Sequence, residues 1–182
     1  NMFQGYWQTS IGLELKGKVI GLIGLGKIGS QVAMVAKAFG MEVVAWSENL
    51  NLTNANKLGV LPVSKEDLLK TSDIISIHLV MGEKYKNLIT KKEFEMIKKS
   101  SFIINTSRGE LVKENDIIWA LKNKLISGYG ADVIEKEFID IRKSPIIKNI
   151  SNYNIIVTPH IGGMTYQGQL RAYNYAVDKF KK

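Results

Sequence analysis

A glycine-rich turn near the start of the chain constrains the fold more than any other feature. The residues Gly24-Leu25-Gly26-Lys27-Ile28-Gly29 directly follow the apolar run Val19–Ile23 and directly precede a helical pattern. In this context Gly24 permits a tight bend, Gly26 lets backbone N–H groups approach phosphate, and Gly29 lets the helix pack closely on its strand. The start of the helix then stabilises negative charge. The turn therefore predicts a cradle for the pyrophosphate of a dinucleotide.

Short apolar runs alternate with helical patterns from residue 18 onward. This alternation predicts an α/β fold with a doubly wound parallel sheet and helices on both faces. The runs are continuous, as expected for strands that are covered on both sides. The predicted strands are Lys18–Ile23, Glu42–Trp46, Ile74–His78, Ser101–Asn105, Gly128–Val133 and Asn154–Thr158, with a weaker one at Val60–Val63.

The helices between these strands are indicated by their caps and apolar periodicity. Ser64 is a capping residue for one helix, and Thr90-Lys91-Lys92-Glu93 is a capping box for another. The other predicted helices are Lys27–Phe39, Lys113–Lys124 and Thr165–Phe180. Nothing in the composition marks a domain boundary, so we expect an irregular lead-in over 1–17 and one dinucleotide-binding domain over 18–182.

Composition excludes several classes of site and partner. The chain has 182 residues, enough for one well-buried domain, and it lacks an apolar run long enough for a membrane helix. It has no cysteine and only two histidines, so we expect a cytoplasmic protein without disulfides, thiolate chemistry or a metal site. The net charge of +8 comes from lysines scattered along the chain rather than from one basic run, which argues against nucleic acid as a partner.

The second predicted strand ends where an acidic residue is expected to bind the adenosine ribose. Ser47 stands at that position. Glu48 is the next residue, so its side chain is expected to point to the opposite side of the chain. A serine leaves room for a 2′-phosphate. However, no arginine follows Ser47 nearby, and the first lysine after it is Lys57, so the sequence offers no close cation to neutralise such a phosphate. NAD is slightly preferred, and NADP stays open.

Three further residues follow predicted strands, at the edge where ligands bind in such sheets: Arg108, Glu137 and His160. Taken singly, an arginine after a strand is usually a surface or capping group, a glutamate in a polar stretch is usually solvated, and a lone histidine is usually structural. Together they supply what hydride transfer to a keto acid needs: a guanidinium for the carboxylate, a histidine for the proton, and a carboxylate to hold the histidine. His78 is assigned a structural role at its strand end.

This combination resembles the D-2-hydroxyacid dehydrogenase family. Gly21–Gly29 is similar to its phosphate loop, and Asn105–Gly109 resembles its arginine signature. Asp132–Glu137 resembles its glutamate segment, and Thr158–Gly163 its histidine segment. The numbers of residues between the arginine, glutamate and histidine motifs are also similar to those in the family.

The resemblance implies a cofactor-binding domain of the Rossmann type and a division of labour within its site. Arg108 would bind and polarise the 2-oxo acid, His160 would be the acid/base, and Glu137 would raise the basicity of His160. Asp132 would hold the nicotinamide carboxamide. The implied cofactor contacts are Gly24, Gly26, Lys27, Ile28 and Gly29 at the pyrophosphate, Ser47 at the ribose, Leu79 and Thr106 as walls, and Arg108, Asp132, His160 and Gly162.

The family encloses its substrate between this domain and a second one, for which the sequence leaves no residues. The resemblance thus implies NAD or NADP binding without efficient turnover, a small 2-oxo or 2-hydroxy acid as substrate, and a homodimer. Phe138 and Val80 replace prolines that are common in the family, which is expected to reshape loops only.

Other functional classes remain as alternatives. The chain could be a dinucleotide-sensing interaction module of the corepressor type, although no DNA-binding element or peptide-docking tail is visible. A formate dehydrogenase would have glutamine at the carboxylate position, where this chain has Glu137. A purely structural α/β domain would not explain why four motifs coincide at strand ends.

Overall fold

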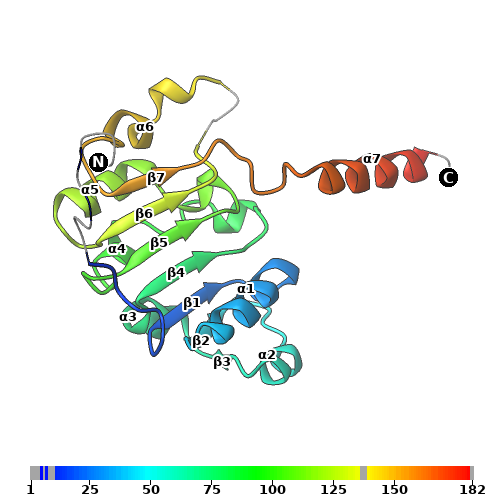
Figure 1. Ribbon diagram of the computed structural model, residues 1–182, viewed down its shortest axis with the longest axis horizontal. Coiled ribbons are helices and arrows are strands. Elements are labelled where there is room, and N and C mark those ends of the chain that lie inside the picture. The colour runs from blue at the N-terminus through cyan, green and yellow to red at the C-terminus, as the bar shows by residue number, and fades with distance from the viewer. Residues whose placement is uncertain (1–4, 6, 8–10, 136–138, 181–182) are drawn as a thin grey trace.

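The computed structural model describes residues 5, 7, 11–135 and 139–180. Its centre is one parallel sheet of seven strands in the order β3-β2-β1-β4-β5-β6-β7 (Figure 1). The seven predicted strands are confirmed to within two residues at each end. The strands are β1 (Val19–Ile23), β2 (Glu42–Trp46), β3 (Leu61–Pro62), β4 (Ile74–Ile77), β5 (Phe102–Asn105), β6 (Gly128–Ala131) and β7 (Ile155–Val157).

Seven α-helices connect or follow these strands in the described part of the chain. The predicted caps are confirmed: the Ser64 hydroxyl accepts the Asp67 N–H at 3.0 Å, and Thr90 and Glu93 form the capping box. Two short helices, α2 and α6, were not anticipated. The helices are α1 (Lys27–Ala38), α2 (Leu52–Leu58), α3 (Lys65–Thr71), α4 (Lys91–Phe94), α5 (Glu114–Lys122), α6 (Pro145–Asn149) and α7 (Tyr166–Phe180), with 3₁₀ turns η2 (Glu83–Tyr85), η3 (Gly109–Leu111) and η4 (Ile141–Lys143).

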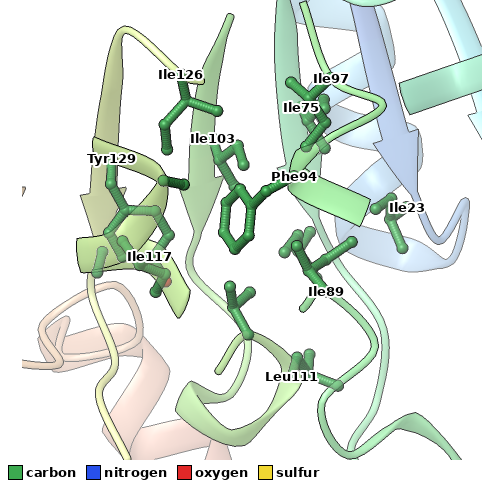
Figure 2. Close-up of a cluster of buried hydrophobic side chains, with 14 of the residues drawn as sticks. Ile23, Ile75, Ile89, Phe94, Ile97, Ile103, Leu111, Ile117, Ile126 and Tyr129 are labelled. Atoms are coloured by element: carbon green, nitrogen blue, oxygen red, sulfur yellow. The ribbon is translucent and has the colours of Figure 1, made fainter. Parts of the chain in front are cut away.

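The hydrophobic core lies on both faces of the sheet. On one face, Ile75 and Ile103 of the strands pack with Phe94 of α4 and Ile117 of α5, all fully buried (Figure 2). On the other face, α1 packs on β1 and β2. Full burial of side chains of this size stabilises the fold by about 1.5–3 kcal/mol each.

One part of the second face has little cover among the described residues. The parallel register places Ile104, Gly130 and Ile156 on the same side of the sheet as Phe102, the side on which α1 lies. Ile156 is 70% exposed and Phe102 37% exposed. We call these four residues the uncovered face. The expectation that helices cover both sides of every strand is therefore wrong for β5, β6 and β7 on this side.

The last helix stands apart from the rest of the domain. Figure 1 shows α7 projecting away from the sheet at the C-terminal end of the described chain. None of its residues is buried.

The carboxyl ends of the central strands meet at one edge of the sheet, and backbone hydrogen bonds continue past them. The His78 N–H donates to Ile23 at 2.8 Å, and the Asp132 N–H donates to Asn105 at 3.0 Å. The Thr158 N–H donates to Ala131 at 2.9 Å. The segments that follow β1, β4, β5, β6 and β7 therefore emerge side by side.

Candidate functional site

The three glycines of the turn after β1 have different surroundings. Gly24 has a φ of 100°, and a Cβ there would lie 2.8 Å from the carbonyl oxygen of His78. A Cβ on Gly29 would lie 2.2 Å from the carbonyl oxygen of Gly24, so the helix approaches the turn too closely for any side chain. Gly26 faces open space, with no described atom within 4 Å of a Cβ position. The first and third glycines are required by the fold, whereas the second leaves a surface open to a ligand.

The start of α1 presents donors to that open surface. Gly26 is the N-cap residue, no side chain of the described residues caps the helix there, and the first turn contains no acidic residue. The first N–H groups of a helix lack partners within the helix and favour negative charge. Lys27 and Ile28 of this first turn are exposed. A pyrophosphate fits this arrangement of an open glycine, free helical donors and a neighbouring lysine.

A hollow of about 400 Å³ lies beside this turn, where the strand order reverses between β1 and β4. Ligands bind at such a point in open α/β sheets. The structure brings four predicted site residues together around it: Ile28, Leu79, Thr106 and Arg108. The other lining residues are His78, Val80, Met81 and Ser107.

The loop that carries Arg108 is fixed by a buried amide. The Asn105 side chain donates from Nδ2 to the Arg108 carbonyl at 2.9 Å and accepts the Ser107 N–H at 3.1 Å. The Ser107 hydroxyl donates to the Leu79 carbonyl and ties this loop to the end of β4. The Arg108 side chain itself is exposed. A rigid loop thus presents a guanidinium at the rim of the hollow.

Asp132 is a nearly buried carboxylate that anchors the loop after β7. It accepts hydrogen bonds from the Thr158 hydroxyl, from the Ile161 N–H at 2.9 Å and from the Gly162 N–H at 2.8 Å. Burial alone would raise the pKa of Asp132, but these bonds hold it below its usual range. Oδ2 accepts only one of the three bonds, so it retains capacity for a further donor such as a carboxamide N–H.

His160 lies on the loop that Asp132 anchors, in an unusual backbone conformation. Its φ is 53°, in the left-handed region, and its side chain is exposed. Together with Asp132 it borders a second hollow of about 360 Å³, whose other lining is mainly apolar and comes from η4, α6 and the end of β7. The structure therefore places Arg108 and His160 at the same edge of the sheet but on different hollows. Glu137 lies outside the described residues, so its pairing with His160 stays a prediction.

At the end of β2, the predicted ribose site contains a cation that sequence reasoning missed. Ser47 is half-buried, and the exposed Glu48 forms an ion pair with Lys84 of η2 and accepts the Tyr85 hydroxyl at 3.2 Å. The hydrogen bond with Lys84 holds the pKa of Glu48 below its usual range and raises the pKa of Lys84. The sequence indicated that no lysine or arginine lies close to Ser47. The structure corrects this, because Lys84 lies beside Glu48 at the end of β2. The two residues are 36 positions apart, and no local pattern connects them.

His78 forms a local contact at the end of β4. Its Nε2 lies 2.9 Å from the Ser76 hydroxyl, and burial holds its pKa below the usual value. This environment agrees with a structural role for the residue.

Two other features are absent from the described part of the chain. No group of three or more histidine, aspartate or glutamate side chains there could hold a metal ion. No helix of the described residues has the length and apolar character needed to cross a membrane.

Known proteins similar to this chain are dehydrogenases and reductases. It is 35% identical over 161 residues to a glyoxylate reductase of Aeropyrum pernix and 36% identical over 159 residues to one of Thermococcus litoralis. These alignments cover 88% and 87% of this chain but only 47% and 46% of the relatives. The chain therefore spans about half the length of the curated relatives it matches.

Solved structures agree with these relatives. The D-lactate dehydrogenase of Aquifex aeolicus, determined in complex with NAD and lactic acid, superposes with a TM-score of 0.89 at 29% identity. The superposition covers 99% of this chain and 58% of that one. A glyoxylate reductase structure from Paecilomyes thermophila gives a TM-score of 0.86 at 31% identity, covering 99% of this chain and 54% of that one.

The sequence profile of one protein family matches residues 1–162, which include the glycine turn and the motifs around Arg108, Asp132 and His160. The fold is the Rossmann type that this family's cofactor domain requires, with the switch-point hollow beside the glycine turn. The chain belongs to the family of D-isomer specific 2-hydroxyacid dehydrogenases and comprises its NAD-binding domain.

Proposed function

We propose that the chain supplies the dinucleotide-binding side of an enzyme that interconverts a 2-oxo acid and a 2-hydroxy acid. The observation that carries this proposal is the hollow at the switch point, where the open glycine turn and Arg108 lie on one site. A nicotinamide bound there supplies or accepts the hydride. The alternative of a dinucleotide-sensing interaction module finds no support among the relatives named above.

Four polar residues have a chemical task in this proposal. The guanidinium of Arg108 pairs with the substrate carboxylate through two hydrogen bonds and polarises the neighbouring carbonyl. The imidazole of His160 donates a proton to the substrate oxygen during reduction and takes it back during oxidation. Glu137 is the proposed carboxylate partner of His160. Asp132 would accept a carboxamide N–H of the cofactor while it anchors the loop of His160.

We further propose that NAD is preferred over NADP. The carboxylate of Glu48 next to Ser47 repels a 2′-phosphate, and the same carboxylate already neutralises Lys84. A ribose without that phosphate meets only the Ser47 side chain and the ion pair. Lys84 is therefore not available to a phosphate as long as Glu48 binds it.

Titration of the 182-residue polypeptide with NADH by calorimetry tests the cofactor proposal. We expect saturable binding of NADH and weaker binding of NADPH. With glyoxylate or pyruvate we expect slow turnover, because Arg108 and His160 are both exposed and water reaches the reacting groups. Folded protein that binds neither NADH nor NADPH would refute the proposal.

We also propose that a second copy of the chain packs on the uncovered face. Phe102 and Ile104 of β5 and Ile156 of β7, with Gly130 of β6 between them, form an apolar surface, and apolar surfaces of this kind mark interaction sites. A two-fold symmetric pair buries the same surface on both partners. Light scattering that finds only monomer at high protein concentration would exclude this arrangement.

A further inference from the structure

A hollow with mainly aliphatic walls lies beside the residue that the proposed function uses as acid/base. Its volume is about 360 Å³, and His160 is part of its lining. Ligand pockets in proteins start at about 300 Å³ and are mostly apolar, with a few polar groups. The size and lining of this hollow, which we call the apolar hollow, are therefore those of a ligand site. Its aliphatic residues are Ile134, Ile141, Ile147, Ile150 and Val157.

The walls of the apolar hollow are held by contacts outside it. Val157 belongs to β7, and Ile147 belongs to α6. The Ser144 side chain at the start of α6 accepts the Ile146 N–H at 3.1 Å and donates to Glu114 at 2.8 Å. Glu114 is 4% exposed, so this anchor of α6 lies inside the domain. The apolar hollow is thus a preformed feature of the fold.

The lining of the apolar hollow favours an apolar ligand group over an anionic one. None of the described residues around it is a lysine or an arginine. The Thr158 hydroxyl is bonded to the Asp132 carboxylate. A further carboxylate in the hollow would lose water without gaining a cation, and it would face the charge of Asp132. Ile141 and Ile150 are 51% and 38% exposed, and covering them with an apolar group is favourable.

The reacting carbon of a 2-oxo acid has a third substituent that must find space near His160. This carbon carries a carboxylate, an oxygen and a side chain, and its three bonds diverge in one plane. In the proposed function Arg108 binds the carboxylate and His160 acts on the oxygen. Arg108 borders the hollow at the switch point, whereas His160 borders the apolar hollow. A side chain that points away from Arg108 and past His160 is therefore directed to the apolar hollow.

We propose that the apolar hollow takes the side chain of the substrate, which is a 2-oxo or 2-hydroxy acid with an apolar side chain larger than methyl. The inference rests on the proposed function, which supplies the roles of Arg108 and His160. It narrows the substrate class, because glyoxylate has no side chain and pyruvate has only a methyl group to place in about 360 Å³. Substrates with a second carboxylate or a phosphate are disfavoured by the same lining.

Binding of 2-hydroxy acids to the NADH-loaded polypeptide tests this inference without turnover, because both partners are then in their reduced form. Ligand-observed NMR titrations give the dissociation constants of D-lactate, D-2-hydroxyisocaproate and D-2-hydroxyglutarate. Each methylene that is buried strengthens binding by about fourfold. We expect D-2-hydroxyisocaproate to bind roughly tenfold or more tightly than D-lactate, and D-2-hydroxyglutarate to bind no more tightly than D-lactate. Equal dissociation constants for all three would overturn the inference.

A lysine at the apolar hollow should reverse this order. Ile150 is the C-cap residue of α6 and is partly exposed, so Ile150→Lys adds an ammonium group there with little effect on folding. We expect this variant to bind D-2-hydroxyglutarate several-fold more tightly than D-2-hydroxyisocaproate. Leu52→Lys is the matched control, because Leu52 is exposed on α2 and does not line the hollow, and it should keep the wild-type order. Should Ile150→Lys not fold, Ile141→Lys in η4 makes the same test.

Each negative outcome identifies the statement that fails. If the hydroxy acids bind but neither their side chain nor Ile150→Lys affects the order, the substrate side chain lies elsewhere and the proposed function stands. If the NADH-loaded polypeptide binds none of the three, the proposed function fails and the inference fails with it. If Ile150→Lys changes the oligomeric state in light scattering instead of the order of binding, the hollow belongs to a protein interface and the inference is wrong.

Discussion

Alanine substitutions at two glycines of the turn after β1 should separate cofactor binding from stability. At Gly26 an added Cβ meets no described atom within 4 Å, and φ is −80°, which alanine adopts readily. Alanine is a poorer N-cap than glycine but restricts the unfolded chain, and these opposing effects are each about 1 kcal/mol or less. Gly26→Ala should therefore unfold at nearly the wild-type temperature.

Binding of NADH should respond very differently to Gly26→Ala. The new methyl group occupies the surface on which we propose that the pyrophosphate meets the backbone N–H groups of α1. Loss of one hydrogen bond to a charged group costs about 1.5–3 kcal/mol, which corresponds to roughly tenfold to hundredfold weaker binding. Calorimetric titration measures this change, and Gly12→Ala, also in open space but in the lead-in, is the control that should alter neither property.

Gly29→Ala should show the opposite behaviour. Its Cβ would lie 2.2 Å from the Gly24 carbonyl oxygen, so backbone must move to admit it. Overpacking of this kind costs about 2 kcal/mol or more, which lowers the melting temperature by roughly 4–8 °C in a chain of this length. If Gly26→Ala binds NADH as tightly as wild type, the pyrophosphate does not lie on this turn. If Gly29→Ala melts at the wild-type temperature, the close approach of α1 to the turn is wrong.

Three other changes test separate parts of the structure. Glu48→Gln should release Lys84 and raise the affinity for NADPH relative to NADH several-fold in paired titrations, an effect that added salt should reduce; an unchanged ratio would remove Glu48 from cofactor selection. Ile156→Asp on the uncovered face should convert the proposed dimer to monomer in light scattering, whereas Leu61→Asp on β3, where the side chain is also well exposed, should not; a dimeric Ile156→Asp would place the interface elsewhere. Asp132 has a lowered pKa in the folded chain, so it stabilises the fold above its unfolded pKa of about 3.9, and this contribution is lost as pH falls through the folded value. Asp132→Asn should accordingly lower the melting temperature near neutral pH and have little effect in strong acid, and an equal loss at both would contradict this linkage.

Local patterns in the sequence predict the sheet and much of the site. The continuous apolar runs identify β1, β2, β4, β5, β6 and β7 because each of these strands has buried residues, whereas the two-residue β3 has none and gives only a weak signal. Parallel strands end at a common edge, which predicts Arg108 at the ligand-binding edge of the sheet. The family resemblance adds Ile28, Leu79 and Thr106, which line the same hollow as Arg108. Capping residues such as Ser64 and Thr90 are equally local signals.

Features that depend on tertiary contacts were not predictable in this way. The seven residues of α2 include poor helix formers, and the helix is held at its end by Lys37, whose Nζ donates to the Leu58 and Gly59 carbonyls at 3.0 and 2.9 Å. The five residues of α6 are too few to show a period. The contacts of Lys84 with Glu48 and of Glu114 with Ser144 join segments 36 and 30 positions apart, which no spacing rule anticipates.

The left-handed backbone of His160 restricts which residues can occupy this position, independently of the chemistry of the imidazole. A β-branched residue is strained at a φ of 53°, and alanine there carries a backbone cost of about 1 kcal/mol. Asparagine tolerates this conformation and lacks only the imidazole. An alanine substitution at His160 would thus mix a backbone effect with the loss of the imidazole, whereas asparagine would separate the two.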